Sequence, residues 1–214
     1  HDHYGNGYFM LPGPTGVIIR LDPRTHETIT IDLDVDVDVD DMAYGNKTWV
    51  ATTNAGILVS NDDWASWTIT TAPSVPNAVQ NVIYINGPKW VLIDNYERYI
   101  STDNAMTFTN TGVTVINGVY SQLFGAKVIH NIEGVLFFET FNGLIRSTDE
   151  GVTWAPTPPT NTYSNLRYSN GLYIVIGDTV GSPSSTISVS FNGMDWVDTD
   201  YNDFNERGKL SYSE

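Results

Sequence analysis

The segment Asp198-Thr199-Asp200-Tyr201-Asn202 places acidic and amide side chains at alternate positions. Oxygen donors at this spacing begin a calcium-binding loop, so Asp198, Asp200 and Asn202 are candidate metal ligands. The sixth and twelfth positions of the motif hold Asp and Lys, where Gly and a bidentate Glu are expected. An ordinary polar loop is therefore the competing interpretation, and calcium is the one cofactor that the sequence raises.

A second acidic segment, residues 28–40, reads TITIDLDVDVDVD and alternates aliphatic with polar residues. A period of two puts the aliphatic side chains on one face of a strand and the aspartates on the other. We predict a solvated outer strand whose charge prevents edge-to-edge association. A calcium site made by the carboxylates is the alternative.

Polar and aromatic residues in loops expected at one end of the fold are the ligand-binding candidates. Loops held by a rigid scaffold commonly carry binding sites, and an exposed tyrosine ring can stack on a sugar. The candidates are Asp94, Asn95, Tyr96, Arg98, Asn142, Tyr163 and Tyr201. The four histidines show no i, i+4 spacing, so a zinc site is not indicated, with His1-x-His3 as a weak exception.

The chain of 214 residues has 25 acidic and 10 basic residues and a formal net charge of −15. This charge argues against nucleic acid or an anionic membrane as partner, because both select basic surfaces. No apolar run is long enough to span a bilayer. Cysteine is absent from the sequence, so disulfides and thiolate metal sites play no part.

An internal repeat positions these candidates. Residues 147–154 read S-x-D-x-G-x-T-W, with weaker copies at residues 60–67, 101–108 and 190–196, and Asp22 marks a fifth, degenerate copy. The key residues are 40, 41, 46 and 43 positions apart, which is close to the length of a four-stranded propeller blade. The key residues are Asp22, Asp62, Asp103, Asp149 and Asn192.

Each copy is preceded by a turn between apolar runs, such as Asn6-Gly7 and Asn170-Gly171, which is a strong hairpin signal. We therefore expect an all-β fold, a five-bladed β-propeller of four-stranded antiparallel blades in a single domain, 1–214. The predicted blades are 1–34, 40–72, 80–112, 126–158 and 164–200, with 208–214 as a closing strand. In-phase Trp49, Trp90, Phe137 and Tyr173 are predicted core residues.

The repeat resembles the Asp-box (BNR, sialidase-type) β-propellers, of the kind found in phage tail and virion proteins. The resemblance implies that the box is a structural turn, in which Ser and Asp bond backbone donors and the aromatic residue packs between sheets. The first copy departs from the pattern, with Arg20 in place of Ser and no Trp. The implied box residues are Ser60, Asp62, Trp67, Ser101, Asp103, Phe108, Ser147, Asp149, Gly151, Trp154, Ser190, Asn192 and Trp196.

These features favour a non-catalytic binding or structural module, in a virion tail or an extracellular setting. The expected partners are other structural proteins, a glycan, or further copies of the chain. One alternative is a small sialidase-like glycoside hydrolase whose substrate carboxylate would meet Arg98, Arg167 and Arg207; another is a secreted bacterial surface scaffold. The Arg-Ile-Pro signature of the sialidases is absent from the sequence, and fold by itself does not assign an activity.

Overall fold

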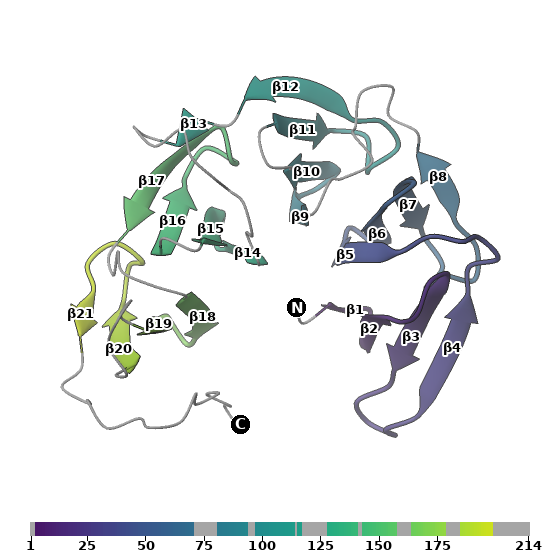
Figure 1. Cartoon of the computed structure of the whole chain (residues 1–214), viewed down its shortest axis with the longest axis horizontal. Coiled ribbons are helices and arrows are strands. Elements are labelled where there is room, and N and C mark those ends of the chain that lie inside the picture. The colour runs from purple at the N-terminus through teal and green to yellow at the C-terminus, as the bar shows by residue number, and fades with distance from the viewer. Residues whose placement is uncertain are drawn as a thin grey trace. The chain divides into compact units, whose positions relative to one another are not determined.

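The computed structural model describes residues 3–70, 81–93, 97–113, 115–116, 128–140, 143–157, 164–178 and 185–198. These residues form strands and turns, with 21 strands labelled β1 to β21 in Figure 1. Within these ranges, no helix has the length and apolar character needed to cross a membrane. The predicted closing strand, 208–214, lies outside the described residues.

Three sheets belong to a first compact unit, residues 1–115 with 149–152. The first sheet is β1 (Tyr4–Gly5), β2 (Tyr8–Pro12), β3 (Val17–Leu21) and β4 (Thr28–Asp32). The second is β5 (Val39–Gly45), β6 (Thr48–Thr53), β7 (Gly56–Ser60) and β8 (Thr68–Thr70). The third is β9 (Asn81–Asn86), β10 (Lys89–Ile93), β11 (Glu97–Ser101) and β12 (Thr109–Val113). In each, strands adjacent in sequence pair in order.

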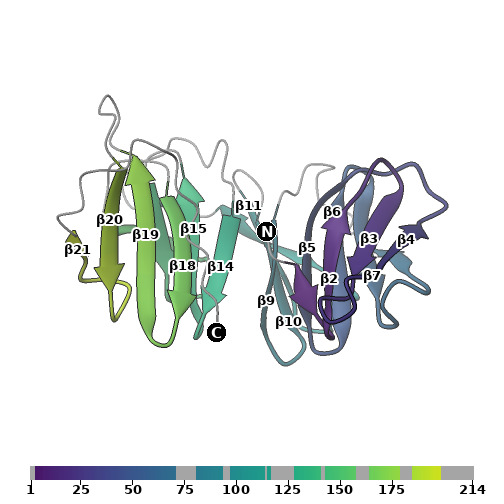
Figure 2. The ribbon, with the colours of Figure 1, turned by 90° about the horizontal axis from the view of Figure 1, so that it is seen from below.

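Two further sheets belong to a second unit, residues 116–148 with 153–214. One holds β14 (Val128–Ile132), β15 (Val135–Thr140), β16 (Gly143–Ser147) and β17 (Thr153–Thr157), with β13 (Val115–Ile116) beside β17. The other holds β18 (Ser164–Ser169), β19 (Leu172–Asp178), β20 (Ser185–Ser190) and β21 (Val197–Asp198). The strands β20, β19 and β18 of this last sheet lie side by side in Figure 2, and neighbouring strands are antiparallel. The extent of the predicted single domain stays a prediction.

The hairpins that open the sheets form where the sequence predicted them. Asn6-Gly7 and Asn170-Gly171 have φ angles of 50° and 85°, and of 51° and 78°. Both positions of such a two-residue turn need positive φ, which Asn and Gly adopt at low cost. Asn46 and Lys47 make the same turn with φ of 47° and 60°.

The strand pairing shows that Phe137, one of the four core residues predicted to lie at equivalent positions, is not at the equivalent position. The serine that begins each box pairs with Trp49, Trp90 and Tyr173 in three sheets, but with Leu136 in the fourth. Phe137 is one residue out of phase and pairs with Arg146, although it is fully buried and packs 5.3 Å from the Tyr173 ring. The strand β15 starts directly after the turn at Glu133-Gly134. Its first four residues, 135–138, are all apolar, so the sequence shows no alternation from which the register could be predicted.

The predicted outer strand over residues 28–40 is wrong beyond Asp32. The strand β4 ends there, and residues 33–38 cross to β5 on the inner side of the second sheet (Figure 1). Buried and exposed residues still alternate along this segment although it is not a strand, and Leu33 and Val37 are 0% and 4% exposed. The turn begins where the N–H of Asp34 donates to Asp32 Oδ1 at 2.9 Å and Asp34 takes a φ of 53°.

The box turns of the second and third sheets share one hydrogen-bond pattern. The Ser60 hydroxyl donates to Asp62 Oδ1 at 3.0 Å, and both Asp62 oxygens accept from Ser66, one from its N–H and one from its hydroxyl. Ser101, Asp103 and Thr107 repeat these contacts at 2.8, 2.9 and 2.6 Å. Each carboxylate therefore closes its own turn.

The remaining boxes vary. Asn192 accepts from the Ser190 hydroxyl at 3.1 Å and from two backbone N–H groups, while Ser147, Ser190 and Gly151 are buried and Asp149 is exposed. In the first sheet, Asp22 accepts instead from the Arg24 side chain and N–H, which lowers the pKa of Asp22 to about 2. The degenerate copy thus keeps an aspartate-centred turn with a different donor.

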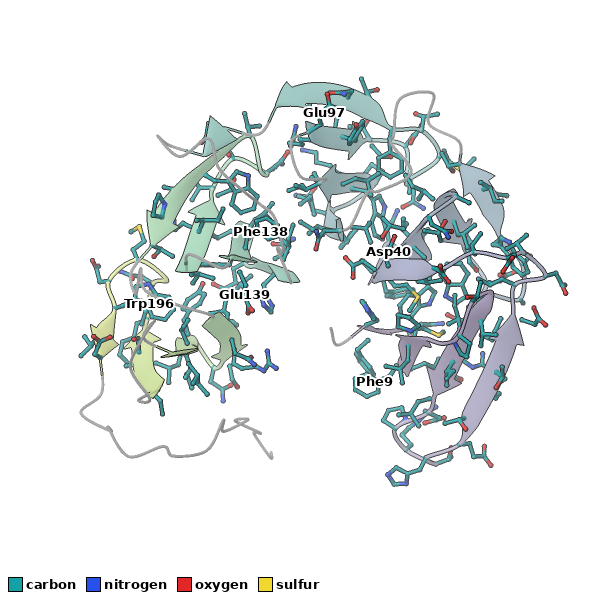
Figure 3. All side chains as sticks on the ribbon, viewed as in Figure 1. Phe9, Asp40, Glu97, Phe138, Glu139 and Trp196 are labelled. Atoms are coloured by element: carbon teal, nitrogen blue, oxygen red, sulfur yellow. The ribbon has the colours of Figure 1, made fainter. Side chains whose placement is uncertain are left out.

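The box aromatics pack inward to different degrees. Phe108 and Trp154 are 5% and 1% exposed, whereas Trp67 and Trp196 are half-buried against neighbouring clusters. The ring centroids of Trp154 and Phe138 lie 5.6 Å apart, and Phe138 is labelled in Figure 3. These rings fill the space between strand faces.

Replacing Trp154 with Ala should lower the free energy of unfolding by roughly 3–5 kcal/mol, because a large buried ring is removed and a cavity is left. Chemical denaturation monitored by circular dichroism measures the change. The matched control is Val152→Ala, since Val152 is 48% exposed, and it should shift stability by less than about 0.5 kcal/mol. Equal effects from both variants would contradict this account of Trp154.

The box carboxylates should make the fold acid-sensitive. Hydrogen bonds from Ser66 lower the pKa of Asp62; burial raises that of Asp103, but the bonds from Thr107 outweigh it and the net shift is also downward. A lowered folded-state pKa stabilises the fold above the ordinary value of 3.8, and this stabilisation is lost as pH falls through the folded pKa.

We therefore expect the variant Asp62→Asn with Asp103→Asn to lose less thermal stability than the wild type between about pH 4 and about pH 2. Melting temperatures across that range provide the measurement. Asp36→Asn, at an exposed position outside the boxes, should retain the wild-type slope. A double variant as steep as the wild type would refute the assignment.

Candidate functional site

The candidate site built from described residues is the segment from Asp32 to Asp40, here called the acidic connection. Its five even-numbered positions from 32 to 40 are exposed aspartates, and the aliphatic residues between them are buried or half-buried. Asp40 is labelled in Figure 3 at the start of β5. The connection therefore presents a row of carboxylates while its aliphatic side chains face the core.

Backbone hydrogen bonds hold the acidic connection against the β2–β3 loop. The N–H of Gly16 donates to the Val37 carbonyl at 2.7 Å, and the N–H of Leu33 donates to the Gly16 carbonyl at 2.8 Å. Gly16 has a φ of 76°, and a Cβ there would lie 2.6 Å from the Val35 carbonyl oxygen. This close approach requires glycine.

Asp38 joins the connection to two loops through its side chain. Its Oδ1 accepts from the Thr15 hydroxyl at 2.7 Å, and its Oδ2 accepts from the Asn54 amide at 3.3 Å. The N–H of Asp38 donates back to Asn54 Oδ1 at 3.1 Å. Burial, and then the charge of Asp38, raise the pKa of Asp40. The hydrogen bonds of Asp38 thus hold a segment that exposes five aspartates.

The described residues include no group of three His, Cys, Asp or Glu side chains placed to hold a metal ion. Asp198, the first predicted calcium ligand, lies on β21 and accepts from the Ser188 hydroxyl at 2.5 Å. The other two predicted ligands, Asp200 and Asn202, lie outside the described residues.

Of the ligand-binding candidates, Arg98 is the one that the structure describes. It lies on β11 with 6% exposure; its Nε donates to the Glu150 carbonyl at 2.8 Å and a terminal nitrogen donates to the Thr111 hydroxyl at 2.9 Å. Burial lowers the pKa of Arg98, opposed by the charge of Glu150. Asp94, Asn95, Tyr96, Asn142, Tyr163 and Tyr201 lie outside the described residues.

Sequence reasoning missed a contact made by the fourth residue of the box. Asp63 accepts from the Asn6 amide of the preceding sheet's hairpin at 2.6 Å, and Asn104 Oδ1 accepts from the Asn46 amide at 3.1 Å. In the fourth box, Glu150 accepts from the Lys89 ammonium at 2.8 Å. The signal was present, because all three boxes carry a polar side chain at this place.

Asp63 and Asn104 also receive an indole donor from their own sheet. Trp49 Nε1 donates to Asp63 at 3.0 Å, and Trp90 Nε1 donates to Asn104 at 3.2 Å. Asp63 and Asn104 therefore each link a buried tryptophan with the hairpin of the sheet before them, while Glu150 contacts the preceding hairpin alone through Lys89. We call this contact the hairpin clasp.

No family model and no curated protein sequence matches the chain. Solved structures do match. An ancestral GH74 enzyme aligns with a TM-score of 0.65 at 11% identity, over 93% of this chain and 30% of that one. YCF48 bound to a D1 peptide aligns with a TM-score of 0.66 at 11% identity, over 90% and 64%. A nidogen/laminin complex gives 0.60 at 11% identity, over 86% and 74%.

At these identities the likeness concerns the fold. The chain spans less than two thirds of the length of the first two structures. Five antiparallel sheets, in each of which four consecutive strands pair in sequential order, agree with these neighbours. The chain is an all-β protein with the β-propeller fold.

Proposed function

We propose that this protein is a non-catalytic binding module that presents the acidic connection to a positively charged protein segment. The observation that carries the proposal is the row of exposed aspartates at positions 32–40, on a backbone held by Gly16 and Asn54 and anchored by buried Leu33 and Val37. Because the surface is already ordered, binding costs little conformational entropy there.

The roles of the described ionisable groups support a non-catalytic reading. Arg98, a candidate for a sialidase-like arginine triad, is occupied by Glu150 and Thr111 in a buried position. Asp62 and Asp103 close their own turns, and Asp63 serves the hairpin clasp. Side chains of the types used in glycoside hydrolysis thus maintain the scaffold at these positions.

A protein partner is favoured by charge and by the neighbours. A net charge of −15 attracts cationic partners and accelerates their encounter. Among the structural neighbours, YCF48 was solved with a D1 peptide and another neighbour comes from a nidogen/laminin complex. We place this module in a virion tail or another extracellular assembly, where it would contact structural proteins.

Neutralising the acidic connection should weaken binding. The triple variant Asp32→Asn, Asp34→Asn, Asp36→Asn removes three exposed charges but retains Asp38, which bonds Thr15 and Asn54. We expect an affinity loss of about tenfold or more for Lys/Arg-rich peptides, and a weaker salt dependence, because fewer charges are screened. Surface plasmon resonance against a basic peptide library at low and high salt provides the measurement.

The matched control removes three exposed charges elsewhere with Glu27→Gln, Glu133→Gln and Asp195→Asn, and should retain most of the affinity. Equal losses from both triple variants would show that net charge, and not the acidic connection, determines binding. If the protein binds a glycan and the first triple variant binds it equally well, the binding site lies on a surface other than the acidic connection. Turnover of a sialoside or xyloglucan would overturn the non-catalytic proposal.

A further inference from the structure

Four Asn-Gly pairs lie in turns within the described ranges. An asparagine followed by glycine can lose its side-chain amide in water, because glycine has no side chain that hinders attack by its own backbone nitrogen. The contacts of each asparagine decide how readily that attack occurs. The four pairs are Asn6-Gly7, Asn86-Gly87, Asn170-Gly171 and Asn192-Gly193.

The reaction, deamidation, needs solvent water as its only co-reactant. The glycine nitrogen forms a bond to Cγ of the asparagine and the Cγ–Nδ2 bond breaks. Nδ2 leaves as ammonia and takes the proton of the glycine N–H with it, which gives a cyclic succinimide. Water then adds to either ring carbonyl and opens the ring, so the final side chain belongs to aspartate or isoaspartate.

Asn6-Gly7 and Asn170-Gly171 form a matched pair that differs in one contact. Both asparagines are exposed, and the two turns have closely similar φ angles, 50° and 85° in the first and 51° and 78° in the second. Asn6 Nδ2 donates to Asp63 Oδ2 at 2.6 Å in the hairpin clasp. The side chain of Asn170, in the hairpin that joins β18 and β19 (Figure 2), has no hydrogen-bond partner among the described residues.

The other two pairs show the same division. Asn192 Nδ2 donates to Asp195 Oδ2 at 2.7 Å, and the N–H of Gly193, whose nitrogen would attack, donates to the Ser190 hydroxyl at 2.9 Å. Asn86, the last residue of β9, is exposed, and its side chain bonds no described residue. Hydrogen bonds thus hold the asparagine of one pair and leave the side chain of the other free.

We propose that Asn86 and Asn170 are sites of spontaneous deamidation and that the hairpin clasp protects Asn6 from the same reaction. Cγ meets the glycine nitrogen only after the turn opens and the side-chain amide rotates. At Asn6 this rotation breaks a hydrogen bond to a carboxylate, which is stronger than a bond between neutral groups. At Asn170 it breaks no side-chain bond to a described residue, so a local opening of the hairpin is enough.

The position of Asn6 gives this protection a structural consequence. Deamidation of Asn6 would replace its amide donor with a second carboxylate beside Asp63, and an ionised carboxylate only accepts hydrogen bonds. The clasp between the first two sheets would then be lost. At Asn170 the same conversion adds one negative charge to an exposed turn and removes no contact with a described residue. The asparagine that joins two sheets is therefore the one whose amide is held.

Peptide mapping by mass spectrometry, after incubation of the whole chain at mildly alkaline pH, measures the conversion at each asparagine. We expect Asn6 to convert at least about fivefold more slowly than Asn170, which is the factor that a typical net hydrogen-bond contribution gives. Asn86 should convert with Asn170. Equal rates at Asn6 and Asn170 in the folded chain would overturn the proposal, and this comparison needs no variant.

Two controls separate the clasp from the local sequence. In urea, which removes the clasp, the rates at Asn6 and Asn170 should approach each other. In Asp63→Asn the remaining side-chain oxygen can accept from the buried Trp49 indole but the amide cannot accept from Asn6, so Asn6 should convert about as fast as Asn170. Asp103→Asn, which changes a carboxylate that closes its own turn, should leave Asn6 slow. Equal acceleration of Asn6 by both variants, or by neither, would refute protection by the clasp.

Discussion

Contact between neighbouring sheets is the interaction on which this structure depends. Each four-stranded sheet has apolar side chains to bury, and a small sheet cannot cover them alone. Met10 and Ile18 of the first sheet join Trp49 and Leu58 of the second in one cluster, and Val50 of the second joins the cluster around Trp90. Burial of these side chains is the main source of stability.

Such packing buries hydrogen-bond donors at the sheet borders, namely backbone N–H groups of the inner strands and indole N–H groups. Each of these donors needs an acceptor. Asp41 accepts the Val82 N–H, and Glu139 accepts that of Leu166. At the box turns, Asp63 and Asn104 accept both an indole and a hairpin amide. The acidic and amide residues inside this protein are thus consequences of how its sheets are stacked.

The exposed aspartates follow a different rule. Those of the acidic connection lie between buried aliphatic residues on a segment tied down by Gly16 and Asn54, so their charges point outward from a fixed backbone. The scaffold therefore uses carboxylates in two ways: buried Asp41 and Glu139 join neighbouring strands across sheets, and the exposed aspartates of the acidic connection are the ones that we propose for a partner. That separation underlies the proposed binding role.

The sequence alone determined the all-β class, the five repeats, the hairpin turns and the alternation of buried and exposed residues along the acidic connection, because each depends on residues close together in the chain. Tertiary structure decided the rest. The end of β4 at Asp32, the register that puts Leu136 opposite Ser147, the burial of Arg98 and the bond from Val82 to Asp41 each depend on a partner from another strand or sheet. Contacts between sheets decide whether a charged side chain faces solvent or a buried donor. The local periodicity of the sequence does not predict those contacts, because they join residues far apart in the chain.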